Sequence, residues 1–561
     1  ANDLCVTSKK RYFKSNLIIS IFILMGLVCI FSYGVDNVSA ASPIYVNTHG
    51  NDTWNGLNST YTGGYNGPKA TIGNATGTVK SGGTVYIASG TYNENNIAIY
   101  NNMTIKGANR INTIINGNNF GSVFIIAGNA NVELDNLTIE NGKADTGTIF
   151  NEGTLIIRNC TFRNNTSTSN TDGGGAILNG GYGTLTITGS SFTSNNATSI
   201  EHGGAAIDNN GKLNLTSDVF TNNTANTGLG GAIFNNYEQN GGYMYVTSCI
   251  FQDNSAMCGA GIYNLGYSTV TSCIFTDSFS STTGGAVCNI GIMTLKNSIF
   301  TNNSATNSSG DGGGAISNGA TLTVTGCTFT SNIAGTSTGP NDPSNGGAIS
   351  SDGTLEVSNS HFIGNTADTG GAIDTVGSLN AKGNTFTDNK AIDDGGAIYN
   401  DGKTTNINFN LIIGNNAKKG NAIYSDYGKV NAVLNWWGCN TRVNVAKQIY
   451  TTGNSSINYN PWIILSINAN PVTVYVKSTS SVTVDLLHDS NGVYENPTKG
   501  VVPYNGSANF KTNKGTIKNV NFVNGKATST LTNLTTPGIV TISATVNNKT
   551  VTTRVIIRSR L

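Results

Sequence analysis

Hydrophobic residues recur from residue 147 to 425 in a unit whose consensus is roughly G-G-A-I-x-N-x-G-x-L-x-V-x-x-S-x-F-x-x-N-x-A. Successive units begin 24 to 33 residues apart. A period of this length is typical of a solenoid, in which each unit buries its apolar face against its neighbours. The apolar residue of G-A-I stands at Ile149, Ile177, Ile207, Ile233, Ile262, Val287, Ile316, Ile349, Ile373, Ile398 and Ile423.

Within each unit, apolar and polar residues alternate over short stretches, which predicts three short strands and one coil of a parallel β-helix. The Gly-Gly, Asn-Gly and Asp-Gly pairs would interrupt any helix. We expect the coils to stack with an aromatic column inside, followed by Ile412 in the last copy. This column is Phe162, Phe192, Phe220, Phe251, Phe275, Phe300, Phe329, Phe362 and Phe386.

An asparagine stands two residues after the apolar residue of G-A-I in most units. Stacked coils would place these side chains above one another, where they can hydrogen-bond inside the coil. The column is Asn151, Asn179, Asn209, Asn235, Asn264, Asn289, Asn318 and Asn400.

Less regular strands begin at residue 84, so the predicted β-helix spans residues 84–462 and has about 14 coils. Residues 41–83 are expected to cap it, because Ile72, Ala75 and Val79 have helical spacing and a solenoid needs its open end covered. At the other end, we expect three tryptophans to close the last coil. They are Trp436 and Trp437 of the N-W-W-G motif and Trp462.

The period disappears after residue 462, and seven short strand-like runs separated by turn pairs such as Asn491-Gly492 follow. This pattern predicts an immunoglobulin-like β-sandwich over residues 463–561. The segment holds no cysteine, so the sandwich would lack an internal disulfide.

Residues 1–40 have the organisation of a secretory signal peptide. Lys9, Lys10 and Arg11 precede an uncharged apolar run over residues 17–31, and Val38-Ser39-Ala40 supplies small residues for cleavage. The alternative is an uncleaved N-terminal membrane anchor, since the apolar run is only slightly short of a spanning helix. Either alternative predicts export.

Charge excludes some partners. Only 11% of residues are charged and the formal net charge is +1, which becomes −1 when residues 1–40 are removed. A nearly neutral chain does not indicate binding to nucleic acid or to an anionic membrane surface.

The G-G-A-I-x-N unit with its L-x-V-x-x-S-x-F-x-x-N continuation resembles the polymorphic outer-membrane-protein type of right-handed β-helix repeat. Together with N-W-W-G, N-P-W and the C-terminal segment, which resembles the bacterial Ig-like invasin domain, the chain is similar to the Asn/Thr-rich adhesin-like surface proteins of methanogenic archaea. The resemblance implies a cell-surface location and a binding or structural role.

Parallel β-helices also carry polysaccharide-degrading enzymes, so catalytic residues must be considered. Asn170-Thr171-Asp172 matches the N-T-D motif of galacturonan hydrolases, and Asp393-Asp394 could supply a second acid. They lie about eight coils apart, whereas inverting carboxylates lie about 6.5–9.5 Å apart. Arg158 and Arg163 could serve a lyase, but no dense acidic group accompanies them. We predict no catalytic residue.

No metal or cofactor site is predicted either. Asp172 and Asp311 precede Gly-Gly pairs but stand alone, and isolated carboxylates bind calcium weakly. His202 and His361 are about five units apart, and no C-x-x-C motif occurs. Four cysteines stand two positions before the Phe column, in a slot for small residues, and we expect them to be buried free thiols. A disulfide between Cys249 and Cys273, in neighbouring coils, stays open. These four cysteines are Cys160, Cys249, Cys273 and Cys327.

The sequence therefore predicts an exported, non-catalytic surface protein that presents a rigid β-helix to surface glycans or cell-envelope proteins. It would meet the membrane only through its N-terminal hydrophobic segment. Outward-facing Phe234, Tyr263 and Tyr399 are candidate ligand contacts. The alternative is a polysaccharide-processing or carbohydrate-binding protein on the same scaffold.

Overall fold

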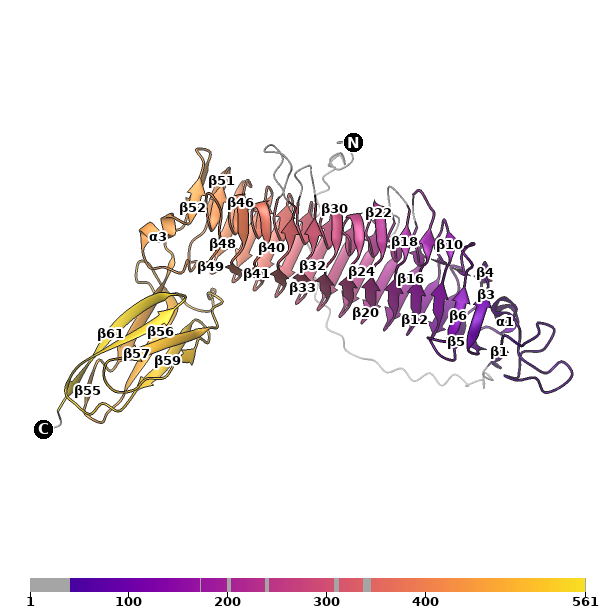
Figure 1. Cartoon of the computed structure of the whole chain (residues 1–561), viewed down its shortest axis with the longest axis horizontal. Helices are drawn as coiled ribbons and strands as arrows, with labels where there is room; N and C mark the ends of the chain where they lie inside the picture. The colour runs from indigo at the N-terminus through magenta and orange to yellow at the C-terminus, as the bar shows by residue number, and fades with distance from the viewer. Residues whose placement is uncertain are drawn as a thin grey trace, which may run out of the picture. The chain divides into compact units, whose positions relative to one another are not determined.

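The structure is a computed structural model that describes residues 41–171, 173–198, 203–237, 242–306, 312–335 and 345–559. The predicted signal segment lies outside these residues. Residues 44–458 form a parallel β-helix of about 13 turns, so the predicted all-β fold is confirmed. Its strands follow one another from β2 (Gly83–Ile87) to β53 (Ser455–Asn458), and Figure 1 shows the coils stacked in chain order.

A typical coil contributes one strand to each of four sheets: β12 (Thr154–Arg158), β13 (Thr161–Arg163), β14 (Thr166–Ser167) and β15 (Ile177–Asn179). We call the sheets 1 to 4 in this order, and they contain 16, 13, 10 and 14 strands respectively. The sequence predicted only three strands per coil. Sheet 3 gave no signal because many of its strands have two residues with one small inward side chain, such as Ala197 of β18 (Asn196–Ala197).

Sheet 1 supplies the widest face of the coil. Its first half is formed by β1 (Ile44–Val46), β2, β5 (Met103–Gly107), β8 (Asn131–Asp135), β12, β16 (Thr184–Thr188), β20 (Lys212–Thr216) and β24 (Tyr243–Thr247). The second half is formed by β28 (Tyr267–Thr271), β32 (Ile292–Lys296), β36 (Thr321–Thr325), β40 (Thr354–Ser358), β44 (Ser378–Lys382), β48 (Thr404–Asn408), β51 (Gly428–Asn431) and β53.

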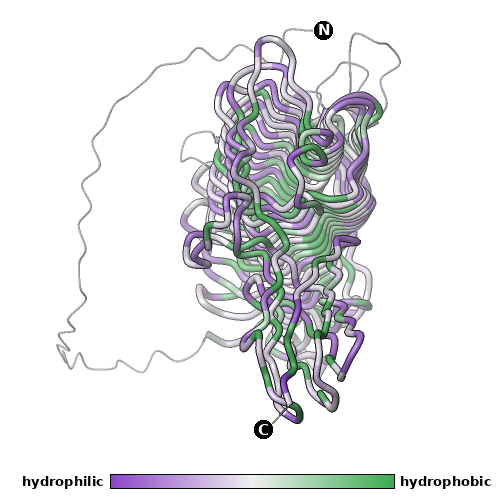
Figure 2. The backbone as a smooth tube through the Cα atoms, turned by 90° about the vertical axis from the view of Figure 1, so that its left-hand side faces the viewer, coloured by the Kyte–Doolittle hydropathy of each residue, from purple (hydrophilic) through white to green (hydrophobic). Residues whose placement is uncertain are grey.

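Sheet 2 runs from β3 (Gly90–Asn93) to β49 (Leu411–Ile413), sheet 3 from β10 (Lys143–Ala144) to β46 (Lys390–Asp394), and sheet 4 from β4 (Ile97–Ile99) to β52 (Ile449–Thr451). Neighbouring strands pair in parallel and mostly in register. Equivalent residues of successive coils therefore lie above one another, which places the hydrophobic positions of successive coils together in Figure 2.

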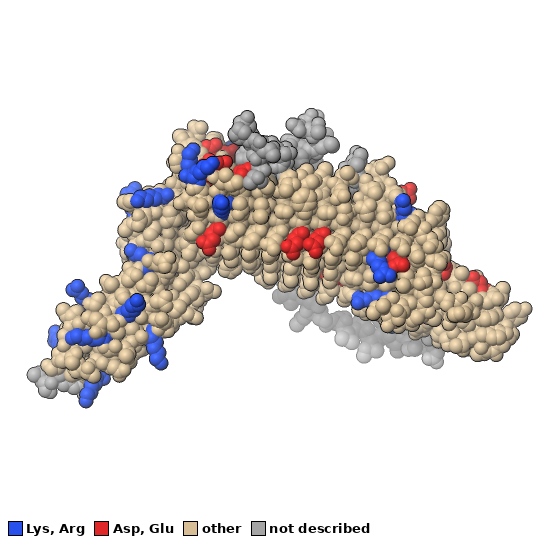
Figure 3. Space-filling model, viewed as in Figure 1, with Lys and Arg blue, Asp and Glu red and all other residues tan. Residues whose placement is uncertain are grey.

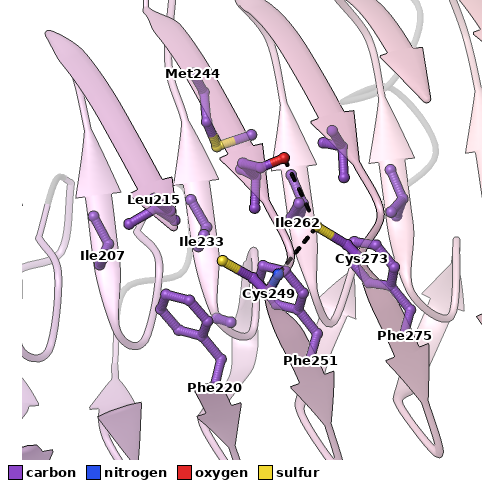
Figure 4. Packing of buried hydrophobic residues seen from close by; sticks show 14 of the residues in the cluster. Ile207, Leu215, Phe220, Ile233, Met244, Cys249, Phe251, Ile262, Cys273 and Phe275 are labelled. Carbon is purple, nitrogen blue, oxygen red and sulfur yellow. Dashed lines mark hydrogen bonds between the residues drawn. The ribbon is translucent and has the colours of Figure 1, made fainter. Parts of the chain in front are cut away.

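The predicted interior columns are confirmed. The nine phenylalanines stack with ring centroids 4.6 to 4.9 Å apart and planes within 10° of parallel. Figure 4 shows Phe220, Phe251 and Phe275 in this column beside the buried Cys249 and Cys273. Offset stacking of this kind adds about 0.5–1.5 kcal/mol per pair beyond burial.

The asparagine ladder is also formed. From Asn151 to Asn289, each side-chain amide donates to the Oδ1 of the next asparagine at 2.7 or 2.8 Å. A second buried ladder follows the Phe column: Asn195 Nδ2 donates to Asn223 Oδ1 at 2.9 Å and to the Phe162 carbonyl at 3.1 Å. Both ladders satisfy polar groups that would otherwise be costly to bury.

The N-terminal end carries the predicted short helix, α1 (Ile72–Thr78). Thr71 caps it by accepting from the Asn74 N–H at 3.2 Å, and the Glu94 carboxylate accepts from the Ile72 and Gly73 N–H groups at 2.7 and 2.9 Å. Helix N-termini favour such acceptors because their first N–H groups have no intrahelical partner.

At the C-terminal end, Trp437 and Trp462 belong to the core of the β-helix, as expected of residues that close its last coil. Trp436 does not, because its indole is buried among side chains of the C-terminal sheets. A second short helix, α3 (Arg442–Ala446), lies between β51 and β52.

The C-terminal residues form two sheets around a shared core. One contains β54 (Ile463–Asn470), β56 (Ser480–Asp489) and β59 (Lys526–Leu531). The other contains β55 (Thr473–Tyr475), β61 (Lys549–Arg558), β60 (Gly538–Val546), β57 (Ser507–Thr512) and β58 (Val520–Asn521). The predicted run at residues 516–520 meets β58 only at Val520, and β54 was not predicted. The other six predicted runs overlap the strands closely; they are residues 472–477, 481–487, 507–510, 527–531, 539–546 and 550–557. The immunoglobulin-like assignment stays a prediction.

Candidate binding face

The outward aromatic residues singled out in the sequence are mostly covered. Phe234 and Tyr263 stack at 5.4 Å but are 0% and 9% exposed. They pack with Cys258 and with the half-buried Leu229, which are the last residues of two sheet 3 strands. The prediction that these two rings contact a ligand is therefore wrong, because sheet 3 folds over this part of the outer side of sheet 4.

Tyr399 of β47 (Ile398–Asn400) is half-buried and stacks on Tyr424 at 5.1 Å, and Tyr424 stacks on Tyr450 at 5.3 Å. Lys419 Nζ lies 5.3 Å from the centre of the Tyr450 ring. Tyr424 in the middle of the stack is buried, whereas Tyr450 at its end is exposed.

Sheet 1 exposes a different set of tyrosines, which the sequence analysis missed. Tyr243 and Tyr245 project outward from β24, and Tyr267 from β28. The rings of Tyr243 and Tyr267 stack at 5.3 Å, and Tyr237 lies 6.1 Å from Tyr267. We call Tyr237, Tyr243, Tyr245 and Tyr267, with Ile290 and Ile292 of the next coil, the tyrosine face; all six side chains are exposed.

The strands that carry the tyrosine face hold uncharged polar residues on their outer side, and a lysine flanks them on each side: Lys212 of β20 pairs with Tyr243, and Lys296 of β32 pairs with Thr271. Asn214, Tyr245 and Thr269 are successive partners across β20, β24 and β28, and Thr247 pairs with Thr271. The outward positions of β24 and β28 hold no Asp, Glu, Lys or Arg. Tyrosine combines an apolar ring with a hydroxyl and loses little conformational entropy on binding, which suits contact with a hydroxyl-rich ligand.

Two of the tyrosines interact electrostatically. The adjacent Tyr237 phenol raises the pKa of Tyr267, with smaller contributions from burial and from Tyr243. A signal for this face was present in the sequence, because Y-M-Y-V-T and Y-S-T-V-T place tyrosine at positions that alternate with buried residues.

The residues considered for galacturonan hydrolysis are not brought together. Asn170 and Thr171 precede β15, and Asp172 lies outside the described residues. Asp393 and Asp394 precede β47, eight strands farther along sheet 4, which corresponds to about 38 Å. Asp393 forms an ion pair with Lys418.

A group of carboxylates that the sequence analysis missed lies near Tyr399 and Tyr424. Burial raises the pKa of Asp374 to about 7, although its carboxylate accepts from the Thr369 hydroxyl at 2.7 Å. Burial and the neighbouring Asp426 raise the pKa of Asp401. Asp374 is 2% exposed and cannot reach a ligand, whereas Asp401 and Asp426 are half-buried.

The other candidates have structural surroundings. Arg158 and Arg163 form ion pairs with Glu133 and Glu140 at 3.0 and 2.6 Å. His361 is half-buried in β41 (His361–Ile363), whereas His202 and Asp311 lie outside the described residues. Within the described part of the chain, no three His, Cys, Asp or Glu side chains gather where they could hold a metal ion.

The four cysteines of the small-residue slot are buried free thiols, as predicted. Cys249 N–H donates to Cys273 Sγ at 3.4 Å, and Cys273 Sγ lies 3.7 Å from the Val246 carbonyl (Figure 4). The hydrogen bond with Cys273 and burial raise the pKa of Cys249 far above its ordinary value.

Comparisons with known proteins agree with this architecture. A model of the Chlamydia polymorphic membrane protein (Chlamydia_PMP) repeat matches residues 385–401. No curated protein matches the chain. The family match lies within the repeat array and applies to that segment alone.

Two solved structures are similar to this chain at low identity and low TM-score. The PL6 family alginate lyase AlyGC is 10% identical, with a TM-score of 0.35 over 70% of this chain and 52% of the lyase. The catalytic unit of a GH87 α-1,3-glucanase from Streptomyces thermodiastaticus strain HF3-3 is 12% identical, with a TM-score of 0.30 over 72% of this chain and 68% of the glucanase. The chain spans about half the length of the alginate lyase.

Among residues 41–559, in the parts that the structure describes, no helix is both long enough and apolar enough to cross a membrane. The apolar run at residues 17–31 lies outside these parts.

Proposed function

We propose that this chain is an exported, non-catalytic cell-surface protein of the adhesin-like kind, which binds neutral glycans through the tyrosine face. The observation that carries the proposal is the exposure of four tyrosines on one side of the β-helix, with uncharged polar residues on the same strands and lysines on the two flanking strands. The Chlamydia polymorphic membrane protein repeat at residues 385–401 supports a surface association.

The ligand is inferred from the chemistry of this face. The outward positions of β24 and β28 carry no charge, and the lysines nearest to them in the sheet, Lys212 and Lys296, lie on the flanking strands. A neutral saccharide offers hydroxyls to Asn214, Thr247 and Thr269 and apolar faces to the tyrosine rings. Repetition at one coil spacing, about 4.8 Å, lets an extended polysaccharide contact several coils at once.

The remaining identity follows the sequence resemblance. We infer that residues 463–561 form an immunoglobulin-like module and that the protein belongs with the Asn/Thr-rich surface proteins of methanogenic archaea. Residues 1–40 would direct export, either as a cleaved signal peptide or as an N-terminal membrane anchor.

The test uses residues 41–561 and immobilised neutral polysaccharides: laminarin, mannan and chitin oligosaccharides. Wild-type protein is expected to bind at least one of them, and Tyr243→Ala with Tyr267→Ala is expected to weaken that binding at least tenfold. Tyr182→Ala removes another exposed tyrosine and should leave binding unchanged. Absence of binding to all three polysaccharides, or equal binding by the double variant, would refute the tyrosine face as a glycan site.

A second candidate function is polysaccharide cleavage near Tyr399. It is favoured by the partly exposed Asp394 and Asp401, whose pKa values are raised by burial and by neighbouring carboxylates, beside stacked tyrosines. Polygalacturonate and alginate would be incubated with wild-type protein and with Asp401→Asn. New reducing ends or unsaturated uronate produced by wild-type protein and lost in the variant would establish the enzyme and exclude the non-catalytic proposal.

A further inference from the structure

Charge is divided unequally between the two parts of the chain. Residues 41–462 contain 17 Lys and Arg against 25 Asp and Glu, a net charge of −8. Residues 463–561 contain 10 Lys and Arg against 3 Asp and Glu, a net charge of +7. From residue 496 to the last residue, nine basic side chains occur and no acidic one. The nearly neutral total had concealed this division.

The structure displays these cations on the outside of the C-terminal module, residues 463–561. Lys511 projects from β57, and Arg554 and Arg558 project from β61. Lys499 and Lys526 are exposed elsewhere on the module. On the face shown in Figure 3, the surface over β55 to β61 displays Lys and Arg and no Asp or Glu.

These side chains lack acidic partners. Among residues 463–559, one contact between a basic and an acidic side chain is found, between His488 Nδ1 and Asp485 Oδ1 at 2.8 Å. None of Lys511, Arg554 and Arg558 takes part in it. Uncompensated like charges raise the local potential and attract anionic polymers from solution, an attraction that falls with ionic strength.

We propose that the C-terminal module binds an anionic cell-envelope polysaccharide through this basic surface. The cations are distributed over several strands and loops and do not form one compact pocket. A flexible polymer with repeated carboxylate or phosphate groups can engage several of them at once. This attachment would leave the tyrosine face of the β-helix free, and it does not depend on the function proposed for that face.

A second copy of the chain is a less suitable partner, because many acids of the β-helix are not available. Asp208, Asp218 and Asp374 are buried. Others are neutralised by ion pairs within the β-helix, formed by Glu133, Asp135, Glu140 and Asp393. These seven of the 25 acids of residues 41–462 are therefore unavailable to the basic surface of a second copy.

The test measures binding of residues 41–561 to immobilised polygalacturonate, with neutral dextran as the reference, at low and high salt. Wild-type protein is expected to bind polygalacturonate and not dextran, and to lose at least tenfold in affinity at high salt. The triple variant Lys511→Gln, Arg554→Gln and Arg558→Gln should lose at least tenfold at low salt. Removing three exposed lysines of the β-helix, Lys143→Gln, Lys403→Gln and Lys429→Gln, should change affinity less than twofold.

Three outcomes would overturn the proposal. The triple variant could bind as tightly as wild type while keeping its melting temperature. Vesicles containing anionic phosphatidylglycerol could bind more tightly than polygalacturonate, which would make the module a lipid-binding surface. Duplex DNA could bind more tightly, which would indicate a nucleic-acid surface. Loss of neutral-glycan binding in the Tyr243→Ala/Tyr267→Ala variant leaves this experiment unaffected, so the two proposals fail separately.

Discussion

Trp436 and Trp437 are consecutive in the chain, yet their buried indoles lie in different cores. Trp437 packs with the interior of the β-helix, whereas Trp436 packs with the C-terminal sheets. The backbone of Trp436 also forms a parallel β-bridge with Leu411 of the β-helix. The N-W-W-G motif therefore supplies one aromatic side chain to each of two adjoining cores.

Replacing each tryptophan should destabilise a different part of the protein. Trp436→Ala is expected to lower the stability of the C-terminal sheets by about 3–5 kcal/mol, the range for deletion of a large buried aromatic. Trp437→Ala should instead loosen the last coils of the β-helix. Hydrogen exchange with mass spectrometry measures both regions in one experiment. Equal loss of protection in both regions for both variants would contradict this separation.

The asparagine ladder predicts a strong effect of one nearly isosteric substitution. Asn264 Nδ2 donates to Asn289 Oδ1 at 2.8 Å, and Asn264 Oδ1 accepts from Asn235 Nδ2. Asn264→Asp removes the donor and buries a carboxylate, which should cost about 3 kcal/mol. Thermal unfolding at neutral pH and at pH 4 measures the effect. Protonation should recover part of the loss; a variant as stable as wild type at neutral pH would contradict the role of the ladder.

The phenylalanine column predicts a local loss of stability. Phe275 is fully buried between Phe251 and Phe300, so Phe275→Ala should destabilise the surrounding coils by about 3–5 kcal/mol. Ile274→Ala alters the exposed neighbouring residue and should change stability by less than about 0.5 kcal/mol. Limited proteolysis followed by peptide mapping compares the two variants, and equal cleavage rates would contradict the prediction.

Asp218 predicts a pH dependence. Burial raises its pKa from 3.8 to about 7, against the opposing effect of the Ser190 and Thr216 N–H groups. Between these values the folded protein binds more protons than the unfolded chain, so stability conferred by protonated Asp218 is present below about pH 4 and is lost as pH rises towards 7.

Asp218→Asn should remove this dependence. Asparagine already occupies the equivalent slot at position 384, where Nδ2 donates to the Val357 carbonyl at 3.0 Å. The melting temperature of wild-type protein relative to the variant is expected to fall between pH 4 and pH 7. A difference that stays constant over this interval would show that Asp218 does not titrate there.

The buried thiols predict slow chemical modification. Burial raises the pKa of Cys160 to about 12 and that of Cys327 to about 11, which leaves almost no thiolate at neutral pH. Iodoacetamide should label neither residue in the folded protein and both in denaturant, as measured by peptide mass spectrometry. Rapid labelling of Cys160 under native conditions would contradict its enclosure within the coil.

The repeating pattern determined the architecture because stacking is a local rule. Once Ile207 and Ile233 occupy equivalent positions of successive units, in-register pairing also places the interior columns, with Phe220 above Phe192 and Asn235 above Asn209. Interior columns could therefore be predicted from spacing alone. The short strands of sheet 3 could not, because two residues with one small inward side chain produce no hydrophobic period.

The tertiary structure alone decided which outward residues face solvent. Phe234 and Tyr245 both project away from the coil, but sheet 3 covers the first and nothing in the described chain covers the second, which is 53% exposed. Alternation along a strand distinguishes inside from outside, whereas exposure depends on how distant segments fold over the outer surface. The same reason separates Trp436 from Trp437: sequence placed both at the end of the array, and only the packing of β54 to β61 assigned each indole to its core.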